Sequence, residues 1–542
     1  MFDLLFLEVN ASYSHSMLSY GMLRAYTEKL APEWHWHKIE FTVKNADAAL
    51  FEAELLRIKP SVICATVYLF NREAVLELMK IARVTLPQAR LVLGGPEFLG
   101  DNQQLLSRYP EIDAVLRGDE SGFYHYLQNN EVMDGCFEGE LDELPSPHQL
   151  GYVSPEKPFW QIETSRGCPG HCTFCTSSLS HKVKFHSIDR VRADLQALRG
   201  HGFRNIRVLD RTFNLGQARA IELLRLFREE FSEMSFHLEI EPAGLTPLLF
   251  EELAKAPVDK LHIEAGVQSL NPEVLQACRR SGEPENILNS LRGLLGCENF
   301  ELHIDLIAGL PKQSLASLID DVKSLLALYP HEIQLEKLKI LPGTPLIDDN
   351  PDIEFNPEPP YEVISTPNMN RDDMRTAKTL SQLLDGFSNA RQLHSAFAFA
   401  VKNDPQFLEK LLDYLLQHDE LFEYGKPALD VRFEIMAKLL EADSPAQQVL
   451  YFAGLVAGIY KAEGRGRLFP HSIPADTKTI WSKANAGIPQ RFFEIEFNGN
   501  VGECWTNPRD VEWQSGCNIY YFKLYYGPHP SEILVRKPVR NS

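Results

Sequence analysis

Short apolar runs alternate with amphipathic stretches over the first 135 residues of the chain. The runs have the length of strands, and the stretches between them repeat apolar residues at helical spacing. We expect strands at residues 3–9, 35–41, 61–66, 89–93 and 112–116. Strands and helices that alternate in this way predict an α/β fold with a doubly wound parallel sheet for residues 1–135.

A second alternation of strands and helices follows a proline-containing connector at residues 136–158. Six strands are expected, at residues 159–164, 205–210, 235–240, 260–267, 300–307 and 332–340. Helical patterns lie between them, at residues 191–199, 218–231, 247–255 and 315–328. These repeats predict a partial (β/α)6 barrel over residues 159–350, whose chemistry is expected at the carboxyl ends of the strands.

The last part of the chain, residues 351–542, begins with another proline-rich connector. Apolar residues then recur at helical spacing in residues 374–387, 407–417, 431–440 and 446–460. Alternating, aromatic-rich stretches at residues 492–497 and 519–526 predict a few strands. We therefore expect a mostly helical α+β domain at the C-terminal end.

The composition is that of a globular protein, with 44% hydrophobic and 24% charged residues. No apolar run approaches the roughly 18 residues that a membrane helix requires. The 54 basic and 74 acidic residues give a net charge of −20, which disfavours binding to nucleic acid or an anionic membrane. The first residues carry acids within their apolar run and predict a strand, not a signal peptide. Nine cysteines, an odd number, indicate a reducing cytoplasm.

Three cysteines follow the first expected barrel strand at a C-x-x-x-C-x-x-C spacing. They are Cys168, Cys172 and Cys175. Three thiolates at this spacing can bind one face of a [4Fe-4S] cluster and leave the fourth iron open to another ligand. The alternative is a zinc site with His171, His181 or His186 as the fourth ligand. Structural zinc usually pairs two C-x-x-C halves, which makes zinc the weaker hypothesis.

Ligands of doubly wound sheets bind beyond the carboxyl ends of the strands, where this sequence has three distinctive turns. An apolar and aromatic turn follows the third expected strand, with Tyr68, Leu69 and Phe70. Gly94 and Gly95 follow the fourth strand and, without Cβ atoms, let a ligand approach the backbone closely. Glu120 lies in the turn after the fifth strand.

The cysteine spacing, with the aromatic Phe174 before the last cysteine, resembles the signature of radical S-adenosylmethionine (SAM) enzymes. In that family the amino and carboxylate groups of SAM chelate the open iron. The later strand exits resemble the oxygen-independent coproporphyrinogen dehydrogenase branch of the same superfamily, as in Ile263-Glu264-Ala265-Gly266-Val267-Gln268 and Asp305-Leu306-Ile307-Ala308-Gly309.

This resemblance implies contacts to SAM at successive strand ends. Asp210 would hold the SAM amino group, and Glu239 and Arg280 would fix its carboxylate end. Gln268 and Asp305 would bind the ribose or methionine end. Ile307 and Gly309 would lie along the adenine. Each acidic residue has an alternative role as a helix cap or a salt-bridge partner.

The first domain resembles the flavodoxin-like, cobalamin-binding domain that precedes the radical SAM domain in a large class of enzymes. The resemblance rests on Gly94-Gly95-Pro96 and on the strand exit that ends with Glu120. It implies that Gly94 and Gly95 lie near the nucleotide tail of cobalamin and residues 68–70 near the lower face of the corrin. The Asp-x-His-x-x-Gly loop that ligates cobalt elsewhere is absent from the sequence. The alternative is a vestigial sheet that only packs on the next domain.

Together these resemblances span nearly the full chain and imply a cobalamin-dependent radical SAM methyltransferase. A 5′-deoxyadenosyl radical would remove hydrogen from an unactivated carbon, and methylcobalamin would supply the methyl group. One alternative is a rearrangement, cyclisation or oxidation with the same cofactors. Another is a non-catalytic metal-binding or regulatory protein. We expect a small-molecule or peptide substrate and an electron donor such as flavodoxin or ferredoxin.

Overall fold

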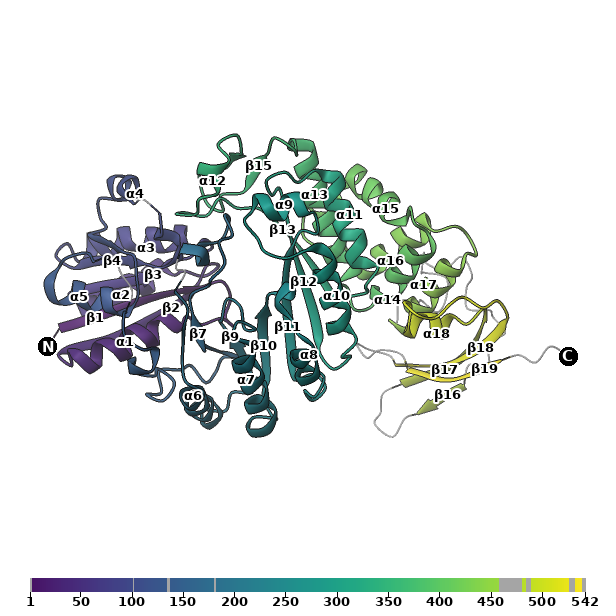
Figure 1. The fold of residues 1–542 in the computed structure, drawn as a ribbon, viewed down its shortest axis with the longest axis horizontal. Coiled ribbons are helices and arrows are strands. Elements are labelled where there is room, and N and C mark those ends of the chain that lie inside the picture. Colours follow the sequence, from purple (N-terminus) through teal and green to yellow (C-terminus); the bar gives the residue numbers. More distant parts are fainter. Residues whose placement is uncertain are drawn as a thin grey trace. The chain divides into compact units, whose positions relative to one another are not determined.

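The computed structural model describes residues 2–100, 102–133, 137–179, 182–457, 480–483, 489–525 and 532–538 (Figure 1). The chain forms two compact units. The first contains residues 1–302, 309–313 and 337–370, and the second contains residues 303–308, 314–336 and 371–542. In the described parts of the chain, no helix combines the length and the apolar character needed to cross a bilayer.

The first sheet has five parallel strands in the order β2-β1-β3-β4-β5. Its strands are β1 (Phe2–Asn10), β2 (Trp34–Thr42), β3 (Val62–Thr66), β4 (Arg90–Gly94) and β5 (Ala114–Leu116). All five overlap the expected strands. The parallel α/β fold predicted for this region is therefore confirmed, and β2 is an edge strand.

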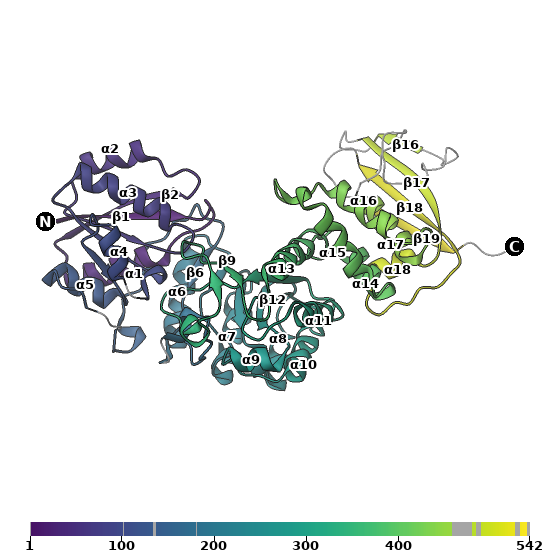
Figure 2. The ribbon, with the colours of Figure 1, turned by 90° about the horizontal axis from the view of Figure 1, so that it is seen from above.

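Helices cover both faces of this sheet because its side chains are apolar on both sides. Leu5 and Leu7 of β1 pack in one core cluster with α2 (Ala48–Ile58) and α3 (Arg72–Thr85). Leu4 and Phe6 pack in the other with α1 (Leu18–Leu30) and α5 (Glu120–Asn129). Figure 2 shows the two helix layers on opposite sides of β1. The short α4 (Gln103–Arg108) precedes β5.

The second sheet has six strands in the order β13-β12-β11-β10-β9-β6. They are β6 (Trp160–Ile162), β9 (Asn205–Val208), β10 (Ser235–Ile240), β11 (Leu261–Gln268), β12 (Glu301–Ala308) and β13 (Glu332–Lys337). Buried and half-buried residues alternate along β11, so its apolar residues lie on one face and its polar residues on the other. The neighbouring β10 alternates in the same way, so the polar side chains of these two strands share one face of the sheet.

Helices follow the strands of this sheet in sequence, as expected for β/α repeats. They are α6 (Ile188–Gly200), α7 (Gln217–Glu230), α8 (Pro247–Leu253), α9 (Pro272–Ala277), α10 (Pro284–Leu295) and α11 (Leu315–Leu326). After β13 come α12 (Leu346–Asp349), β14 (Glu354–Phe355) and β15 (Val363–Ser365). Residues 351–370, which the sequence groups with the C-terminal region, belong to the first compact unit. The domain boundaries themselves stay a prediction.

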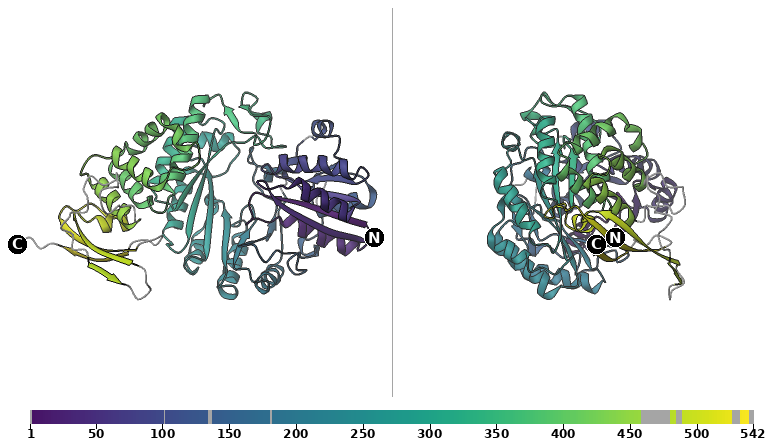
Figure 3. Two further views of the ribbon diagram at one scale, coloured as in Figure 1. Left: turned by 180° about the vertical axis from the view of Figure 1, so that it is seen from behind. Right: turned by 90° about the vertical axis from the view of Figure 1, so that its right-hand side faces the viewer.

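The second unit contains a helical group and an antiparallel sheet (Figure 3). Its helices after α11 are α13 (Arg371–Leu383), α14 (His394–Asn403), α15 (Phe407–Gln417), α16 (Leu429–Leu439), α17 (Pro445–Val456) and α18 (Val501–Thr506). The strands β16 (Ile480–Lys483), β17 (Pro489–Asn498), β18 (Cys517–Tyr525) and β19 (Glu532–Pro538) pair in sequence order. Parts of the expected helix 446–460 and of the expected strand 519–526 lie outside the described residues.

Candidate functional site

The three cysteines lie on a loop that a small hairpin closes at its base. Strand β7 (Ser165–Arg166) enters the loop and pairs antiparallel with β8 (Lys184–Phe185). Gly167 begins the loop with φ +96°, and a Cβ there would lie 2.2 Å from the Lys182 carbonyl oxygen. Glycine is therefore required at the point where the two arms of the hairpin come closest.

The three thiols gather on this loop and remain partly exposed. The Cys168 and Cys172 sulfurs lie 3.3 Å and 3.9 Å from the position of a Cβ at Gly170, and the Gly170 N–H donates to the Cys168 sulfur. The Cys175 N–H donates to the Cys172 carbonyl, which keeps the third cysteine in the same turn. None of the cysteines in the described parts of the chain forms a disulfide.

The cysteine geometry suits a cluster better than a single zinc ion. A tetrahedral zinc ion with Zn–S bonds of about 2.3 Å holds its sulfurs roughly 3.8 Å apart. Among the described residues, the three sulfurs do not form a group within 4.8 Å of one another. Of the histidines proposed as a fourth zinc ligand, His186 pairs with Asp142 at 3.0 Å, and His181 lies outside the described residues.

Burial raises the pKa of the Cys172 thiol, and the charge of Arg280 opposes this rise. The Arg280 Nη1 lies 3.7 Å from the Cys172 sulfur, and its Nη2 forms an ion pair with Glu241 at 2.6 Å. The same guanidinium donates to the Gly266 carbonyl. Its Nε is buried without a hydrogen-bond partner in the described structure. An unpaired guanidinium N–H beside the cysteine loop is suited to an anionic group of a ligand.

Glu241 is the partner of Arg280, a role that the sequence analysis did not assign. Glu239, expected beside Arg280, instead lies half-buried on β10 without a side-chain hydrogen bond or ion pair in the described structure. Burial raises the pKa of Glu239, the nearby Glu264 raises it further, and Arg211 opposes the rise. A carboxylate of this kind accepts a cationic ligand group more readily than an anionic one.

Asp210 fixes the chain immediately before the cysteine loop. It is buried, and it accepts hydrogen bonds from the Thr164 N–H at 2.7 Å and the Ser165 N–H at 2.8 Å. The Thr164 hydroxyl donates to its other oxygen. Both carboxylate oxygens are therefore in use, so the geometry favours a positioning role. Its predicted contact with the SAM amino group stays a prediction.

The remaining predicted SAM residues occupy the ends of later strands. Gln268 ends β11 with φ +68°, and its Nε2 lies 2.9 Å from where a Cβ at Gly266 would stand. The Gly309 N–H donates to the Gln313 Oε1 at 2.7 Å. Asp305 and Ile307 lie on β12 in the second unit. Phe174 is partly exposed beside Cys175. Their proposed contacts stay predictions.

A cavity of about 960 Å³ lies at the carboxyl ends of the first sheet. That volume is at the upper end of the range for ligand pockets. The cavity is lined by four of the six residues predicted to bind cobalamin, namely Tyr68, Gly94, Gly95 and Glu120. Its deeper wall is apolar and includes Phe6, Val92, Leu116 and Phe123. The cavity therefore runs between the sheet and the helix layer that contains α5.

Leu69 and Phe70, the other two predicted cobalamin residues, do not line this cavity. Phe70 is half exposed and stacks on Tyr68, with ring centroids 5.5 Å apart. Of these three residues, only Tyr68 lines the cavity. The contacts of Leu69 and Phe70 with cobalamin stay predictions.

The two glycines after β4 have different reasons to be glycine. Gly95 has φ +110°, and a Cβ there would lie 2.6 Å from the Val67 carbonyl oxygen. Packing against the end of β3 therefore excludes any side chain at this position. At Gly94 a Cβ would meet only the Leu116 carbonyl oxygen, at 3.4 Å. The protein's own packing therefore does not require glycine at position 94, so a closely bound ligand is the better explanation for glycine there.

The cavity also reaches the cysteine loop, since Glu163, Arg166 and Gly167 line it. Arg166 donates to both carboxylate oxygens of Glu120 at 3.1 Å and to Glu163 at 2.8 Å and 2.9 Å. Asp119 caps α5 through the Ser121 N–H, which places Glu120 in the first turn of the helix. Burial lowers the pKa of Arg166, but the charges of Glu163 and Glu120 outweigh this and raise it.

None of the four cationic residues that line the cavity was identified from the sequence, namely Arg166, Lys182, Lys184 and Arg211. Arg166 could have been suspected from its position directly before Gly167-Cys168. Arg211 follows Asp210 at the end of β9, and its exposed side chain has no hydrogen bond or ion pair in the described structure. Thr212, the next residue, has its hydroxyl 4.0 Å from the Cys168 sulfur. One strand end thus contributes to both the cavity and the cysteine loop.

Comparison with known proteins agrees with this geometry. Residues 162–325 match the family model described as the Radical SAM superfamily. The cobalamin-dependent radical SAM methyltransferase TokK of Streptomyces tokunonensis is 23% identical over 371 residues, which is 60% of this chain and 54% of TokK. The uncharacterized methyltransferase PH0819 of Pyrococcus horikoshii is 26% identical over 274 residues, 43% of this chain and 57% of PH0819. The chain thus spans little more than half the length of these curated relatives.

Solved structures share the fold over a longer part of the chain. The cobalamin-dependent S-adenosylmethionine radical enzyme OxsB, with aqua-cobalamin and SAM bound, superimposes with a TM-score of 0.59 at 15% identity. The match covers 86% of this chain and 82% of OxsB. At that identity the likeness is one of fold. Residues 162–325 thus match the Radical SAM superfamily model, and the chain shares the fold of OxsB.

Proposed function

We propose that the protein is a cobalamin-dependent radical SAM enzyme that methylates an unactivated carbon of a small molecule or peptide. The observation that carries the proposal is one cavity of about 960 Å³. It is lined both by residues predicted to bind cobalamin and by residues that flank the three cysteines. The names of TokK and PH0819, both methyltransferases, favour methyl transfer over other reactions.

The residues present fit the three groups that this activity requires. Cys168, Cys172 and Cys175 would hold the [4Fe-4S] cluster, because their three partly exposed thiols lie on one short loop at the spacing of a three-cysteine cluster site. The unpaired Nε of Arg280 would donate to the SAM carboxylate. Glu239 was expected at the same end of SAM, but its raised pKa makes it better suited to accept from the SAM amino group. Tyr68, Gly94, Gly95 and Glu120 would line the cobalamin site.

When bound, the cluster and SAM supply the radical that activates a C–H bond, and cobalamin supplies the methyl group. The chain has to hold these groups in register. Asp210 fixes Thr164 and Ser165 ahead of the cysteines, and Arg166 joins the cysteine-bearing hairpin to α5 through Glu120. The apolar wall of the cavity keeps water away from the reacting groups.

The proposal extends to organisation and partners. Residues 1–135 would form the cobalamin domain, residues 159–350 the partial barrel, and residues 351–542 a C-terminal domain without assigned chemistry. An electron donor such as flavodoxin or ferredoxin would reduce the cluster. A reducing cytoplasm would keep the cysteine thiols from forming disulfides.

The direct test is anaerobic reconstitution of the full chain with iron, sulfide and cobalamin, followed by SAM and a reductant. We expect cluster and cobalamin absorption and formation of 5′-deoxyadenosine, which Cys172→Ala abolishes together with bound iron. Absence of 5′-deoxyadenosine from the fully loaded protein would contradict the proposal. SAM with a deuterated methyl group separates methylation from rearrangement, cyclisation or oxidation, because only methylation transfers the label to product.

A further inference from the structure

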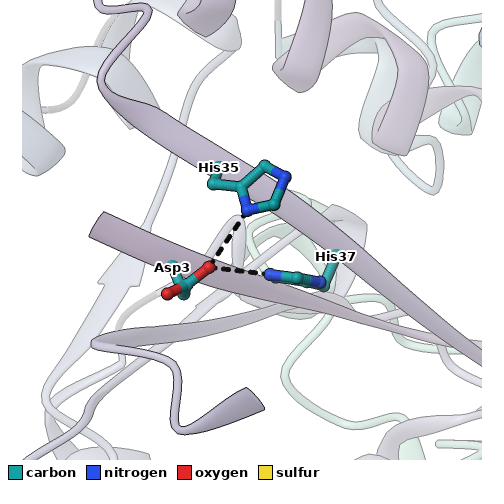
Figure 4. A group of neighbouring side chains, drawn as sticks. All are labelled: Asp3, His35 and His37. Carbon is teal, nitrogen blue, oxygen red and sulfur yellow. Dashed lines mark hydrogen bonds and ion pairs between the residues drawn. The ribbon is translucent and has the colours of Figure 1, made fainter. Parts of the chain in front are cut away.

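A second cluster of metal-ligating side chains lies at the opposite, amino-terminal end of the first sheet. Asp3 of β1 and His35 and His37 of β2 point toward one another there (Figure 4). One Asp3 carboxylate oxygen lies 3.2 Å from the His35 Nδ1 and 2.8 Å from the His37 Nε2. The three ligand atoms all lie within 4.8 Å of one another.

Strand register brings these residues together. Asp3 pairs with His35 across the parallel strands, and His37 is two residues further along the same face of β2. The two imidazole rings are 4.7 Å apart at their centroids. The arrangement thus follows from backbone pairing and from the His-x-His spacing, and it does not depend on a flexible loop.

We propose that these three residues bind a divalent transition-metal ion such as Zn²⁺, with water completing the coordination. Imidazole nitrogen and carboxylate oxygen are ordinary zinc ligands, with bonds of about 2.0–2.2 Å. Ligand atoms of a tetrahedral zinc ion are then roughly 3.4 Å apart. The observed 3.2 Å and 2.8 Å contacts are close to this value, so small side-chain rotations open the space that the ion needs.

The charges around the cluster favour a cation. The two imidazoles are neutral ligands when deprotonated, and the carboxylate supplies one negative charge. Glu54 of α2 adds a second negative charge close enough to interact with His37, although it is also paired with Arg57 at 2.6 Å. The His35 side chain is 60% exposed, so an ion can reach the cluster directly from solvent.

This site is separate from the candidate active site. Asp3 and Asn10 are seven residues apart along β1, and a parallel strand rises about 3.3 Å per residue, which places the two ends of the strand roughly 23 Å apart. The metal would therefore not take part in the chemistry at the cavity. Its effect would be to fasten β2, which is an edge strand, to β1.

The test is calorimetric titration of the cluster-loaded full chain with Zn²⁺ after passage over a chelating resin. We expect one bound ion, and a higher midpoint of thermal unfolding when it binds. Asp3→Asn, His35→Gln and His37→Gln should each weaken binding by about 10-fold or more. His201→Gln, at an exposed histidine after α6, is the matched control and should bind as the wild type does.

Cysteines that hold no cluster could also bind Zn²⁺ if loading is incomplete. A parallel titration therefore uses the triple variant Cys168→Ser, Cys172→Ser, Cys175→Ser. That variant should still bind one ion, because its Asp3, His35 and His37 are unchanged. The proposal is overturned if the wild type binds no Zn²⁺ at micromolar concentrations. It is equally overturned if the three single variants bind Zn²⁺ as tightly as the His201→Gln control.

Discussion

The Arg166 guanidinium donates to both carboxylate oxygens of Glu120, each at 3.1 Å, and so ties the cysteine-bearing hairpin to α5 of the first sheet. Glu120 is almost fully buried, and the charge that balances it comes from a residue 46 positions later in the chain. The two parts of the candidate site are therefore held together by an ion pair that spans two folding motifs.

Arg166→Ala should destabilise the first unit by about 3 to 5 kcal/mol, because it leaves Glu120 buried without a partner. Equilibrium unfolding in urea measures the effect. Arg192→Ala removes an arginine from an exposed pair with Glu230 and should change stability little. Equal stability of the two variants would show that Arg166 does not hold the unit together.

Asp210→Asn should lower the iron bound per chain after reconstitution. The amide oxygen can still accept from the Thr164 and Ser165 N–H groups, but an N–H₂ group replaces the oxygen that accepts from the Thr164 hydroxyl. The hydrogen bonds also lose the assistance of the negative charge, which costs about 1 to 3 kcal/mol and loosens the start of the cysteine loop. Iron analysis and cluster absorption measure this. Asp189→Asn, at an exposed position on α6, should load as the wild type does. Full iron loading of Asp210→Asn would refute the positioning role.

Arg280→Gln should weaken SAM binding by about 10-fold or more, because charge-assisted hydrogen bonds contribute about 1.5 to 3 kcal/mol each. Equilibrium binding of SAM to the cluster-loaded protein measures the change. Arg279→Gln is the matched control, since Arg279 is the preceding residue and pairs with Asp349 at 2.6 Å. If both variants bind SAM equally well, Arg280 does not contact the ligand.

Gly95→Ala and Gly94→Ala should separate folding from ligand binding. At Gly95 the new Cβ would clash with the Val67 carbonyl in a positive-φ conformation, so we expect a loss of about 1 to 3 kcal/mol. At Gly94 the Cβ fits at 3.4 Å, so the protein should fold while cobalamin binding weakens. Thermal unfolding and cobalamin absorption measure the two effects. If Gly94→Ala binds cobalamin as tightly as the wild type, Gly94 does not contact the cofactor.

His148 should make the protein less stable in mild acid. Burial lowers the pKa of His148 from 6.5 to about 4, and the charge of Asp194 only partly opposes this. The unfolded chain therefore takes up a proton below pH 6.5 that the folded chain takes up only near pH 4. Stability from this residue is present above pH 6.5 and is lost as the pH falls toward 4, by roughly 3 kcal/mol in total.

Urea unfolding at pH 7.5 and pH 5 tests this dependence. His148→Gln should lose less stability between the two values than the wild type, whereas His201→Gln, at an exposed position, should behave like the wild type. An identical loss in His148→Gln and the wild type would assign the acid sensitivity to other groups.

The hydrophobic pattern predicted the strands of the first sheet and the strand-helix repeats of the second because both are buried on regular faces. Local spacing also predicted the cysteine loop, since the three cysteines lie within eight residues. Weakly patterned elements were missed. Helix α14 lies in a stretch where alanine and phenylalanine alternate, and α9 is only one to two turns long.

The chain's own sequence thus determined most of the strands and helices and the close spacing of the three cysteines, because these features depend on neighbours along the chain. Only the tertiary structure decided that Arg280 pairs with Glu241 and not Glu239, that Arg166 balances Glu120, and that Tyr68 faces the cavity while Phe70 does not. These outcomes depend on strand register and on which side chains meet across separate elements. Local sequence patterns therefore do not predict them.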